Sequence, residues 1–486
     1  MKLKSALLFL AVCTACSLAH AQIMSESQSQ LKWMKVGGAE NVLYFPNNEM
    51  VVPAMIDRRT YSVVRINDKG AEKWKHDLKE KGRKETIVGI GKFKGNILVL
   101  IANDVSNNYS YGMITRIEGL LLDGAKGTVL QEKTLILLEG KNYVEARMIK
   151  DKNGEVQHVM IRHTRWDGEE GFASRRISRE RAQSKKIELY DISPELTATV
   201  AHEYGINEDV FFYGMGSLPT GDLLVLWLNK TGELVMEQFK GDGVEARVVL
   251  PLDWDKESDF SVNMRMNPDK PTHVVCGINH TNRGKRIATM LVDLETKTVK
   301  THEEKITKDY RRELEATAVA FNAKRLVIQN ELYKDMIVTD IEFYQDKTIV
   351  VKEIGAPTSR SYMNGDAIIT VFDKDMKVLK HFFINKTYPD PVGKSVSLKV
   401  SGDKLQLLTV DMYGLATVSL LYGEINLKTL EWIKLAKVKE GKKEVFGTPF
   451  RIWETIWLPN NMLVNQADPP GLKFIKGELK PVTYDN

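Results

Sequence analysis

The sequence predicts an all-β protein built from one repeated unit of four antiparallel strands. Short runs of β-branched and aromatic residues alternate with turns rich in Gly, Asn, Asp and Pro along most of the chain. The same pattern of a turn followed by an apolar strand recurs eight times between Asn47 and Asn460. The composition, 43% hydrophobic and 27% charged, is that of a folded globular protein and excludes a disordered chain.

The eight copies are spaced about 59 residues apart on average, which leaves room for a second hairpin in each unit. Their turns are anchored at Asn47, Gly95, Asn153, Thr220, Asp269, Ala323, Gly402 and Asn460. The clearest second hairpins lie near Asp68, Asp123, Asp191, Glu295, Asp375 and Lys428. Two hairpins make four strands, and four strands with their turns need about 40–50 residues.

A single four-stranded sheet cannot bury both of its faces, whereas radial stacking of such sheets buries both. The repeat therefore predicts a β-propeller with eight blades. Seven blades are the alternative, because the segment KDMIVTDIEFYQDKTIVVKEI interrupts the sixth unit. Tandem β-sandwiches and a β-solenoid are the other architectures open to such strands. A sandwich requires no single repeat, however, and solenoid repeats are shorter, at about 20–30 residues.

The period and the paired hairpins resemble those of exported bacterial β-propeller proteins of the WD-repeat and quinoprotein-like kind. Trp74 and Trp432 partly match the Gly-x-x-x-Trp pattern of quinoprotein-like repeats, while the Trp-Asp and Gly-His signatures of WD repeats are absent. The resemblance covers about residues 31–486 and implies a fold. It points to no narrower family and to no activity.

Residues 1–21 have the features of a secretory signal peptide. Two lysines precede an apolar run, and residues 19–21 form an A-x-A cleavage site. A lipoprotein signal with Cys16 as the lipidated residue is the alternative. Neither this run nor any later one reaches the ~20 residues of a membrane-spanning helix. We therefore expect an exported protein of the periplasm or cell surface, with an N-terminal segment over 22–38 and a single propeller domain over 39–486.

The charge balance excludes whole classes of partner. The formal net charge is +5, and it becomes +3 once Lys2 and Lys4 leave with the signal peptide. Over so long a chain this charge predicts no general affinity for nucleic acid or for anionic membranes. The mature chain would keep one cysteine, Cys276, in an apolar run. No internal disulfide can then form, and we expect Cys276 to be a small buried apolar side chain.

Two glycine-rich stretches occupy equivalent places in two repeats, and neither has the Lys-Ser ending of a phosphate-binding loop. We interpret them as the innermost strands of two blades, because crowding near the ring axis leaves little room for side chains. The glycines concerned are Gly89, Gly91, Gly95, Gly214, Gly216 and Gly221.

No motif predicts catalysis or metal binding, and GxSxG and HExxH are absent. His158 and His163 differ in parity along one strand, so they would face opposite sides. His273 and His280 flank Cys276 without an identifiable third ligand. One acidic turn lacks the glycine and the final glutamate of a calcium loop; its carboxylates are Asp253, Asp255 and Asp259. The sequence thus predicts neither cofactor nor metal, and it favours a protein that is not an enzyme without deciding the matter.

The most distinctive segment is the basic stretch RHTRWDGEEGFASRRISRERAQSKK, between strands expected over 156–161 and 186–190. Its end, 175–186, and the segment 308–315 are the candidates for helices. Guanidinium groups pair with carboxylates and indoles stack, so the stretch predicts recognition of an acidic partner. A solvated charged insert is the alternative. The candidate binding residues are Arg165, Trp166, Arg175, Arg176, Arg179 and Arg181.

These observations favour an exported, non-catalytic binding or scaffold protein of the cell envelope, whose partner is an unknown envelope protein or an acidic glycan. The alternative is a propeller hydrolase or lyase that acts on glycans at the central channel. Carboxylates converging there with an arginine or a histidine would favour the enzyme, and an apolar or blocked channel would favour the scaffold. The sequence leaves the oligomeric state open.

Overall fold

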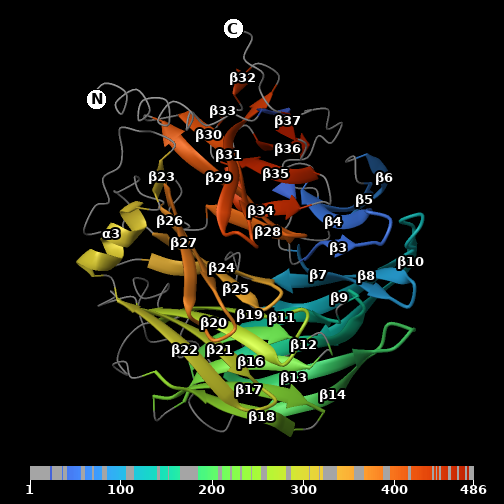
Figure 1. Cartoon of the computed structure of the whole chain (residues 1–486). Helices are drawn as coiled ribbons and strands as arrows, with labels where there is room; N and C mark the ends of the chain where they lie inside the picture. Colours follow the sequence, from blue (N-terminus) through green and yellow to red (C-terminus); the bar gives the residue numbers. More distant parts are fainter. Residues whose placement is uncertain are drawn as a thin grey trace, which may run out of the picture.

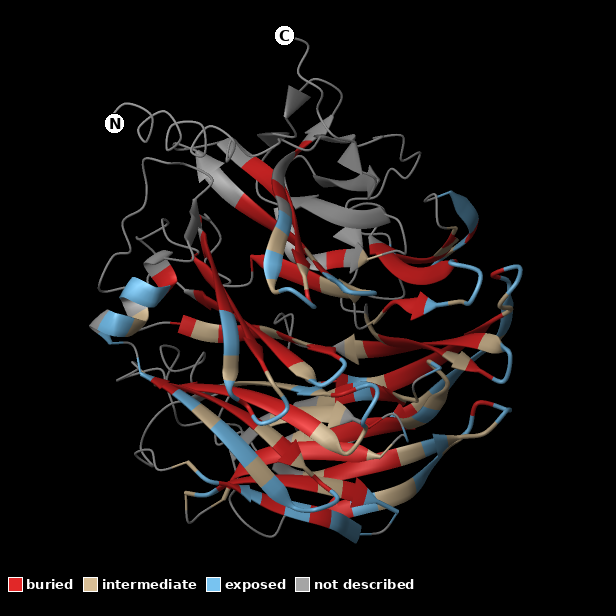
Figure 2. Cartoon of the chain, in the orientation of Figure 1, coloured by how far each residue is buried: buried red, intermediate tan, exposed pale blue. Residues whose placement is uncertain are grey.

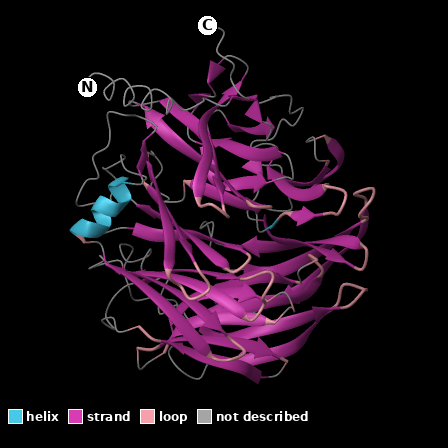
Figure 3. Cartoon of the chain, in the orientation of Figure 1, coloured by secondary structure: helices cyan, strands magenta, loops and turns pink. Residues whose placement is uncertain are grey.

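The structure is a computed structural model, and strands make up nearly all of the part of the chain that it describes (Figure 3). The described residues are 22–24, 35–36, 41–55, 61–67, 71–78, 85–104, 114–138, 143–151, 153–164, 184–205, 211–218, 220, 222–229, 232–241, 243–252, 260–280, 286–305, 307–316, 318–320, 336–354, 366–386, 395–413, 417–440, 443–444, 446–447, 450–457, 461–467, 470–476 and 479–480.

Seven sheets, each with four consecutive antiparallel strands, follow one another along the described chain and form the blades of a β-propeller (Figure 1). Blade 1 holds β3 (Leu43–Tyr44), β4 (Met50–Met55), β5 (Tyr61–Ile66) and β6 (Glu72–Asp77). Blade 2 holds β7 (Glu85–Phe93), β8 (Asn96–Asp104), β9 (Ile114–Leu122) and β10 (Val129–Leu137). Blade 3 holds β11 (Tyr143–Lys150), β12 (Val156–Thr164), β13 (Ser184–Ile192) and β14 (Ala198–Gly205).

The remaining blades continue this order. Blade 4 holds β15 (Phe211–Ser217), β16 (Leu223–Leu228), β17 (Leu234–Lys240) and β18 (Gly243–Leu250). Blade 5 holds β19 (Phe260–Met266), β20 (His273–His280), β21 (Arg286–Asp293) and β22 (Thr298–Lys305). Blade 6 holds β24 (Met336–Tyr344), β25 (Lys347–Ile354), β26 (Ala367–Phe372) and β27 (Val378–Asn385). Blade 7 holds β28 (Val396–Ser401), β29 (Lys404–Tyr413), β30 (Thr417–Asn426) and β31 (Glu431–Glu440).

Short strands extend three of the blades. β2 (Lys35–Val36) pairs with β4, and β23 (Ala318–Ala320) lies parallel to β27. Blade 7 gains β1 (Gln22–Met24), β32 (Lys443–Glu444), β33 (Phe446–Gly447) and β37 (Leu479–Lys480). A further sheet has three described strands, β34 (Phe450–Trp457), β35 (Asn461–Ala467) and β36 (Pro470–Lys476). It lies beside blade 1, so the first and last parts of the chain meet (Figure 1).

The expectation of eight four-stranded blades is wrong, and the described chain has seven. The copy anchored at Asn460 leads into β35 of the three-stranded sheet. The copy anchored at Ala323 lies outside the described residues, and blade 6 begins with β24 instead. The segment that interrupted the repeat is therefore the first hairpin of blade 6. Its turn was missed because Gln345 adopts φ 53° where the sequence pattern looks for Gly, Asn or Asp.

The second hairpin of each blade turns in the same way, which confirms the hairpins predicted near Asp123 and Asp191. A side-chain oxygen at the start of the turn accepts a backbone N–H two to four residues later, as Asp123 does from Lys126 at 2.7 Å. The seven accepting residues are Asn67, Asp123, Ser193, Asn229, Asp293, Asp373 and Asn426. This local bond closes each turn before any contact between blades is needed.

The hydrophobic core lies between the blades rather than at one centre. Six clusters of buried side chains each join two neighbouring blades, from blades 1 and 2 to blades 6 and 7. Figure 2 shows the buried residues along the inside of the sheets and the exposed ones on the outer strands and turns. Cys276 is fully buried in the cluster between blades 4 and 5, which confirms its expected role as a small apolar side chain.

The first strands of neighbouring blades pack closely, and the inner-strand glycines fit that packing. A Cβ atom at Gly89 would lie 2.6 Å from the Cβ of Met148, and one at Gly91 would lie 2.5 Å from Val156 Cγ2. A Cβ atom at Gly216 would lie 3.2 Å from the Met266 side chain. The interpretation as crowded inner-strand positions is therefore confirmed for Gly89, Gly91 and Gly216. It is wrong for Gly95, which lies in the β7–β8 turn with φ 83° and where a Cβ atom would meet nothing within 4 Å. Gly221 lies outside the described residues.

The helix predicted over 308–315 is confirmed as α3 (Lys308–Ala316). The Thr307 hydroxyl accepts the backbone N–H of Tyr310 at 3.2 Å and so caps the helix. The other candidate helix fails at its end, because Ser184–Lys186 belong to strand β13, and its remaining residues lie outside the described chain. Within the described residues, no helix combines the length and the hydropathy needed to cross a membrane.

Candidate functional site

The six predicted binding residues, Arg165, Trp166, Arg175, Arg176, Arg179 and Arg181, lie outside the described residues. The strands on either side are present as predicted, since β12 and β13 pair with Thr164 opposite Ser184. Lys186, at the end of the basic stretch, bonds Glu188 at 2.6 Å and Glu203 at 3.2 Å. These bonds, that with Glu188 above all, raise the pKa of Lys186 above its ordinary value. Lys186 is thus engaged within blade 3.

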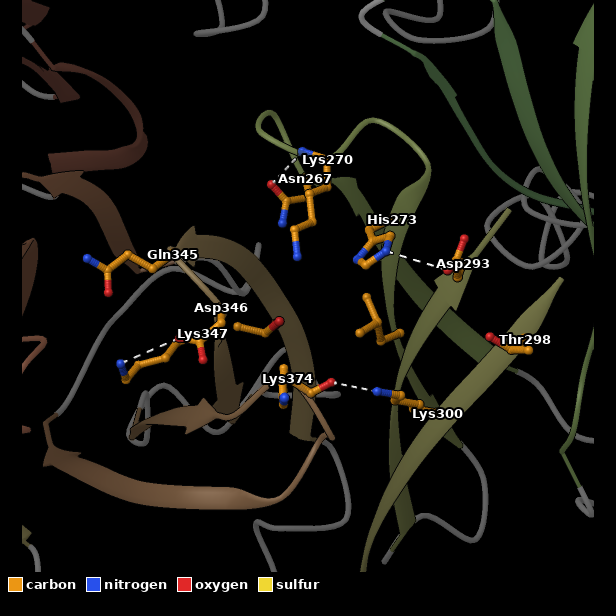
Figure 4. A pocket seen from close by; sticks show the side chains of 12 residues that line it. Asn267, Lys270, His273, Asp293, Thr298, Lys300, Gln345, Asp346, Lys347 and Lys374 are labelled. Atoms are coloured by element: carbon orange, nitrogen blue, oxygen red, sulfur yellow. Dashed lines mark hydrogen bonds and ion pairs between the residues drawn. The ribbon is translucent and has the colours of Figure 1, made fainter. Parts of the chain in front are cut away.

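A hollow of about 210 Å³ opens between blades 5 and 6, where the turns of two neighbouring blades meet (Figure 4). Blade 5 contributes the β19–β20 turn and both ends of the β21–β22 turn. Blade 6 contributes the β24–β25 turn and the β26–β27 turn. The side chains that matter most are Lys270, His273, Lys300, Lys347 and Lys374, with Asp293 and Asp346 among them.

Local turn chemistry sets the position of Lys270. The Asn267 side chain accepts the backbone N–H of Asp269 at 2.9 Å and that of Lys270 at 3.3 Å, which folds the β19–β20 turn over the hollow. The backbone of Asn267 also bonds to His273 across the turn at 2.9 Å. Lys270 extends from this turn toward the hollow in Figure 4.

A lysine bridge holds the two blades together at the hollow. Lys300 of blade 5 donates to the backbone carbonyl of Lys374 at 3.1 Å and to the Asp375 carboxylate at 2.7 Å. The hydrogen bond from Lys300 lowers the pKa of Asp375 below its usual range. Because Lys300 bonds to the β26–β27 turn, it fixes the position of Lys374 relative to blade 5.

The lining of the hollow carries more positive than negative charge, with four lysines against two aspartates. Lys347 lies 3.8 Å from Asp346, and His273 lies 3.6 Å from Asp293. Burial would raise the pKa of Asp293, but hydrogen bonds from Thr296 and Glu295 and the nearby His273 together lower it. No carboxylate of the described chain forms an ion pair with Lys270 or Lys374. Two ammonium groups are thus available to a compact anion.

A second polar group lies on the inner strands of the same two blades. Arg265 of β19 reaches Asp340 at 3.2 Å and Glu342 at 2.7 Å, both on β24. Two carboxylates and an arginine thus converge where the first strands of blades 5 and 6 pack together. Both carboxylates share one guanidinium, however, which also makes the group a tie between neighbouring blades.

Comparisons with known proteins assign this chain to no family. No protein-family model matches the chain, and no curated protein matches it. Similar solved structures include the WD40 domain of SCAP from fission yeast, at 9% identity and a TM-score of 0.42, covering 94% of this chain and 98% of that one. A protein of unknown function from Bacteroides caccae is 8% identical at a TM-score of 0.29, over 70% of this chain and 93% of that one.

The periplasmic gluconolactonase PpgL of Pseudomonas aeruginosa is 8% identical at a TM-score of 0.39, over 79% of this chain and 93% of that one. All three TM-scores lie below 0.5, so the fold rests on the sheets described above. No family is assigned.

Two of the histidines that the sequence singled out, His158 and His163, have carboxylate partners within blade 3. His158 Nδ1 lies 2.8 Å from Asp191, and His163 Nε2 lies 2.6 Å from Glu188. Across the described chain, no group of three or more His, Cys, Asp or Glu side chains is arranged to hold a metal ion. The acidic turn of Asp253, Asp255 and Asp259 lies outside the described residues.

Sequence reasoning missed the lysines of the hollow because they are far apart in the chain, from Lys270 to Lys374. Each looks like an ordinary solvated turn residue. One signal was available: the repeat had placed turns at Asp269, Glu295 and Asp375, and turns at equivalent places of adjacent blades meet at one face of the ring.

Proposed function

We propose that the protein is an exported, non-catalytic binding propeller of the cell envelope that takes an acidic ligand in the hollow between blades 5 and 6. The observation that carries this proposal is the pair of ammonium groups, Lys270 and Lys374, that no described carboxylate neutralises. Export rests on the signal peptide expected over residues 1–21. An envelope protein with an acidic surface segment or an acidic glycan would present the required charge.

The chemistry of the lining supports binding. Lysine side chains supply compact positive charge, while the amide of Asn267 and the hydroxyl of Thr298 add hydrogen-bonding groups for the rest of a ligand. The volume is smaller than the ~300 Å³ at which pockets for drug-sized ligands begin. The hollow therefore suits a single charged unit, such as the end of a larger molecule.

Calorimetric titration with inorganic phosphate and with D-glucuronate tests the site. The variant Lys270→Ser/Lys374→Ser is compared with Lys126→Ser/Lys380→Ser, which removes the same charge from exposed positions elsewhere. We expect the wild type and the control to bind at least one of these anions, and the site variant to bind about tenfold more weakly, the equivalent of about 1.4 kcal/mol. Binding should weaken as salt rises, because exposed charges are screened. Equal binding by both variants, or no binding by the wild type, overturns the proposal.

The inner-strand group favours a second candidate function, a hydrolase or lyase acting on acidic glycans. Glycoside hydrolysis uses two carboxylates on either side of the scissile bond. Asp340 and Glu342 would supply them, with Arg265 holding the acidic substrate. Release of reducing ends from polygalacturonate or hyaluronan by the wild type, and its loss in Asp340→Asn and Glu342→Gln, would support this function. No release by the pure protein would exclude it for these substrates.

A further inference from the structure

The only helix of the described chain, α3, packs on the outside of blade 6, beside β27 (Figure 1). Tyr310 and Leu314 lie four residues apart and so share one face of the helix. Leu314 is fully buried in the cluster between blades 5 and 6, among side chains that include Ile368 and Phe383. Tyr310 packs against the same cluster, so this face of the helix is seated on the apolar interior between the two blades.

Two side chains of α3, Tyr310 and Glu313, contact a buried group of titratable side chains in blades 5 and 6. The Tyr310 hydroxyl donates to Glu304 at 3.3 Å, and its ring meets the ring of His381 edge-on at 5.6 Å between centroids. The carboxylate of Glu313 lies 3.8 Å from His381 Nε2. The attachment of α3 therefore depends on the states of Glu304 and His381.

Beneath the helix, a chain of hydrogen bonds runs into the blade. Lys352, which is fully buried, bonds Glu304 and lies 3.0 Å from the Thr370 hydroxyl. The Thr370 hydroxyl in turn lies 3.0 Å from His381 Nδ1. An ammonium group only donates, so Thr370 accepts from Lys352 and has its own proton to give to His381. Nδ1 of His381 accepts this proton when the ring is neutral and carries its hydrogen on Nε2.

The charged groups around His381 disfavour a positive charge on its imidazole ring. The groups that face it are His302 and Glu304 on β22, Lys352 on β25, and Tyr310 and Glu313 on α3. Glu304 is already paired with Lys352, and Glu313 is largely exposed to solvent, at 60%. A proton on Nδ1 of His381 would place a second cation beside Lys352 and leave the Thr370 hydroxyl accepting from two cationic groups.

We propose that α3 is an acid-released latch, which is held on blade 6 while His381 is neutral and is let go when His381 takes up a proton. Burial, and next the charge of Lys352, lower the pKa of His381 to about 4 in the closed state. A released, solvated histidine has a pKa of about 6.5. Protons therefore bind the released state more tightly, and attachment weakens as the pH falls from about 6.5 toward 4. Above that window the latch is fully closed.

Hydrogen exchange measured by mass spectrometry, corrected for the intrinsic effect of pH on exchange, tests the latch. At pH 7 we expect residues 308–316 to be protected in the wild type, in His381→Gln and in the control His273→Gln. At pH 4.5 the protection factors of residues 308–316 should fall about tenfold in the wild type and in the control, while β8 and β9 of blade 2 stay protected. His381→Gln should keep its protection, because glutamine accepts from Thr370 and cannot be protonated.

Two outcomes overturn the proposal. One is protection of α3 in the wild type that does not change between pH 7 and pH 4.5. The other is equal loss in His381→Gln, which would assign the effect to Glu304 or another carboxylate. NMR titration of the His381 ring in the wild type keeps the test independent of how the variant folds. Its transition must lie well below pH 6.5 and follow the loss of protection, and an ordinary transition without that loss refutes the latch.

Discussion

Bulky side chains occupy the left-handed position in several of the second-hairpin turns. Leu196 has φ 50° and Met376 has φ 60°, yet they are only 0% and 2% exposed. Each reaches from its turn into the cluster shared with a neighbouring blade. The left-handed conformation costs about 1–2 kcal/mol, whereas burying such a side chain contributes about 1.5–3 kcal/mol. Burial therefore outweighs backbone strain at these two turns.

Replacing Leu196 by glycine should destabilise the protein by about 1–3 kcal/mol, because the lost burial exceeds the strain relieved. The matched change is Lys297→Gly, at the equivalent turn of blade 5, where φ is 56° and the side chain is exposed. It loses no burial and should change stability by less than about 1 kcal/mol, in the stabilising direction. Urea unfolding midpoints measure both. Effects of the same sign and size would contradict this account of the turns.

On the inner strands, the packing of neighbouring blades limits the size of the side chain that fits. β7 packs against β11 so closely that a Cβ atom at Gly89 would overlap the Met148 side chain. The outermost strand β18 has no such constraint, and a Cβ atom at Gly243 would meet nothing within 4 Å. At the inner edge of a blade, glycine is thus needed because there is no room for a side chain, whereas at the outer edge a side chain would fit.

Gly89→Ala should lower the free energy of unfolding by about 2 kcal/mol, because Cβ atoms 2.6 Å apart force one of the two strands to shift. Gly243→Ala is the control, and we expect it to leave stability within about 0.5 kcal/mol of the wild type. Thermal unfolding of the two variants under one set of conditions measures the contrast. If Gly89→Ala unfolds at the same temperature as the control, the close approach of β7 and β11 does not limit the side chain at position 89.

Over the whole molecule, the ring could be predicted because each blade repeats its own local signals. Asp123, Asp293 and Asp373 mark second-hairpin turns that close on themselves, so these signals survive without knowledge of the partner blade. The blade count could not be predicted in the same way. The Gln345 turn of blade 6 carries no Gly, Pro or Asn, and the copy at Asn460 leads into a sheet with three described strands.

The hollow could not be predicted, for a related reason. Lys270 and Lys374 belong to different blades, and only the stacking of blade 5 on blade 6 brings their turns together. In the sequence, one lysine in a turn cannot be distinguished from the many solvent-exposed lysines that only keep a protein soluble. The buried pair of Lys352 and Glu304 is hidden likewise, since their positions read as ordinary solvent-facing charges in two separate strands.

The rate at which the Cys276 thiol reacts can report on the unfolding of the whole ring. It lies fully buried between blades 4 and 5, and burial raises the pKa of its thiol, so little thiolate is present and reagents cannot reach it. In the chain that begins at Gln22, we expect reaction with Ellman's reagent only as fast as the protein unfolds. One thiol per chain should react in denaturant, and none in Cys276→Ala. Rapid reaction of the native protein would show instead that blades 4 and 5 separate locally.

Lys270 and Lys374 sit on turns, and the interblade clusters contain neither of them. Substitutions at these two positions should therefore change the charge of the hollow without disturbing the packing that holds the ring together. The same separation suits the engineer. Exchanging Lys270 and Lys374 for glutamates would reverse the charge of the proposed binding site and leave the ring intact.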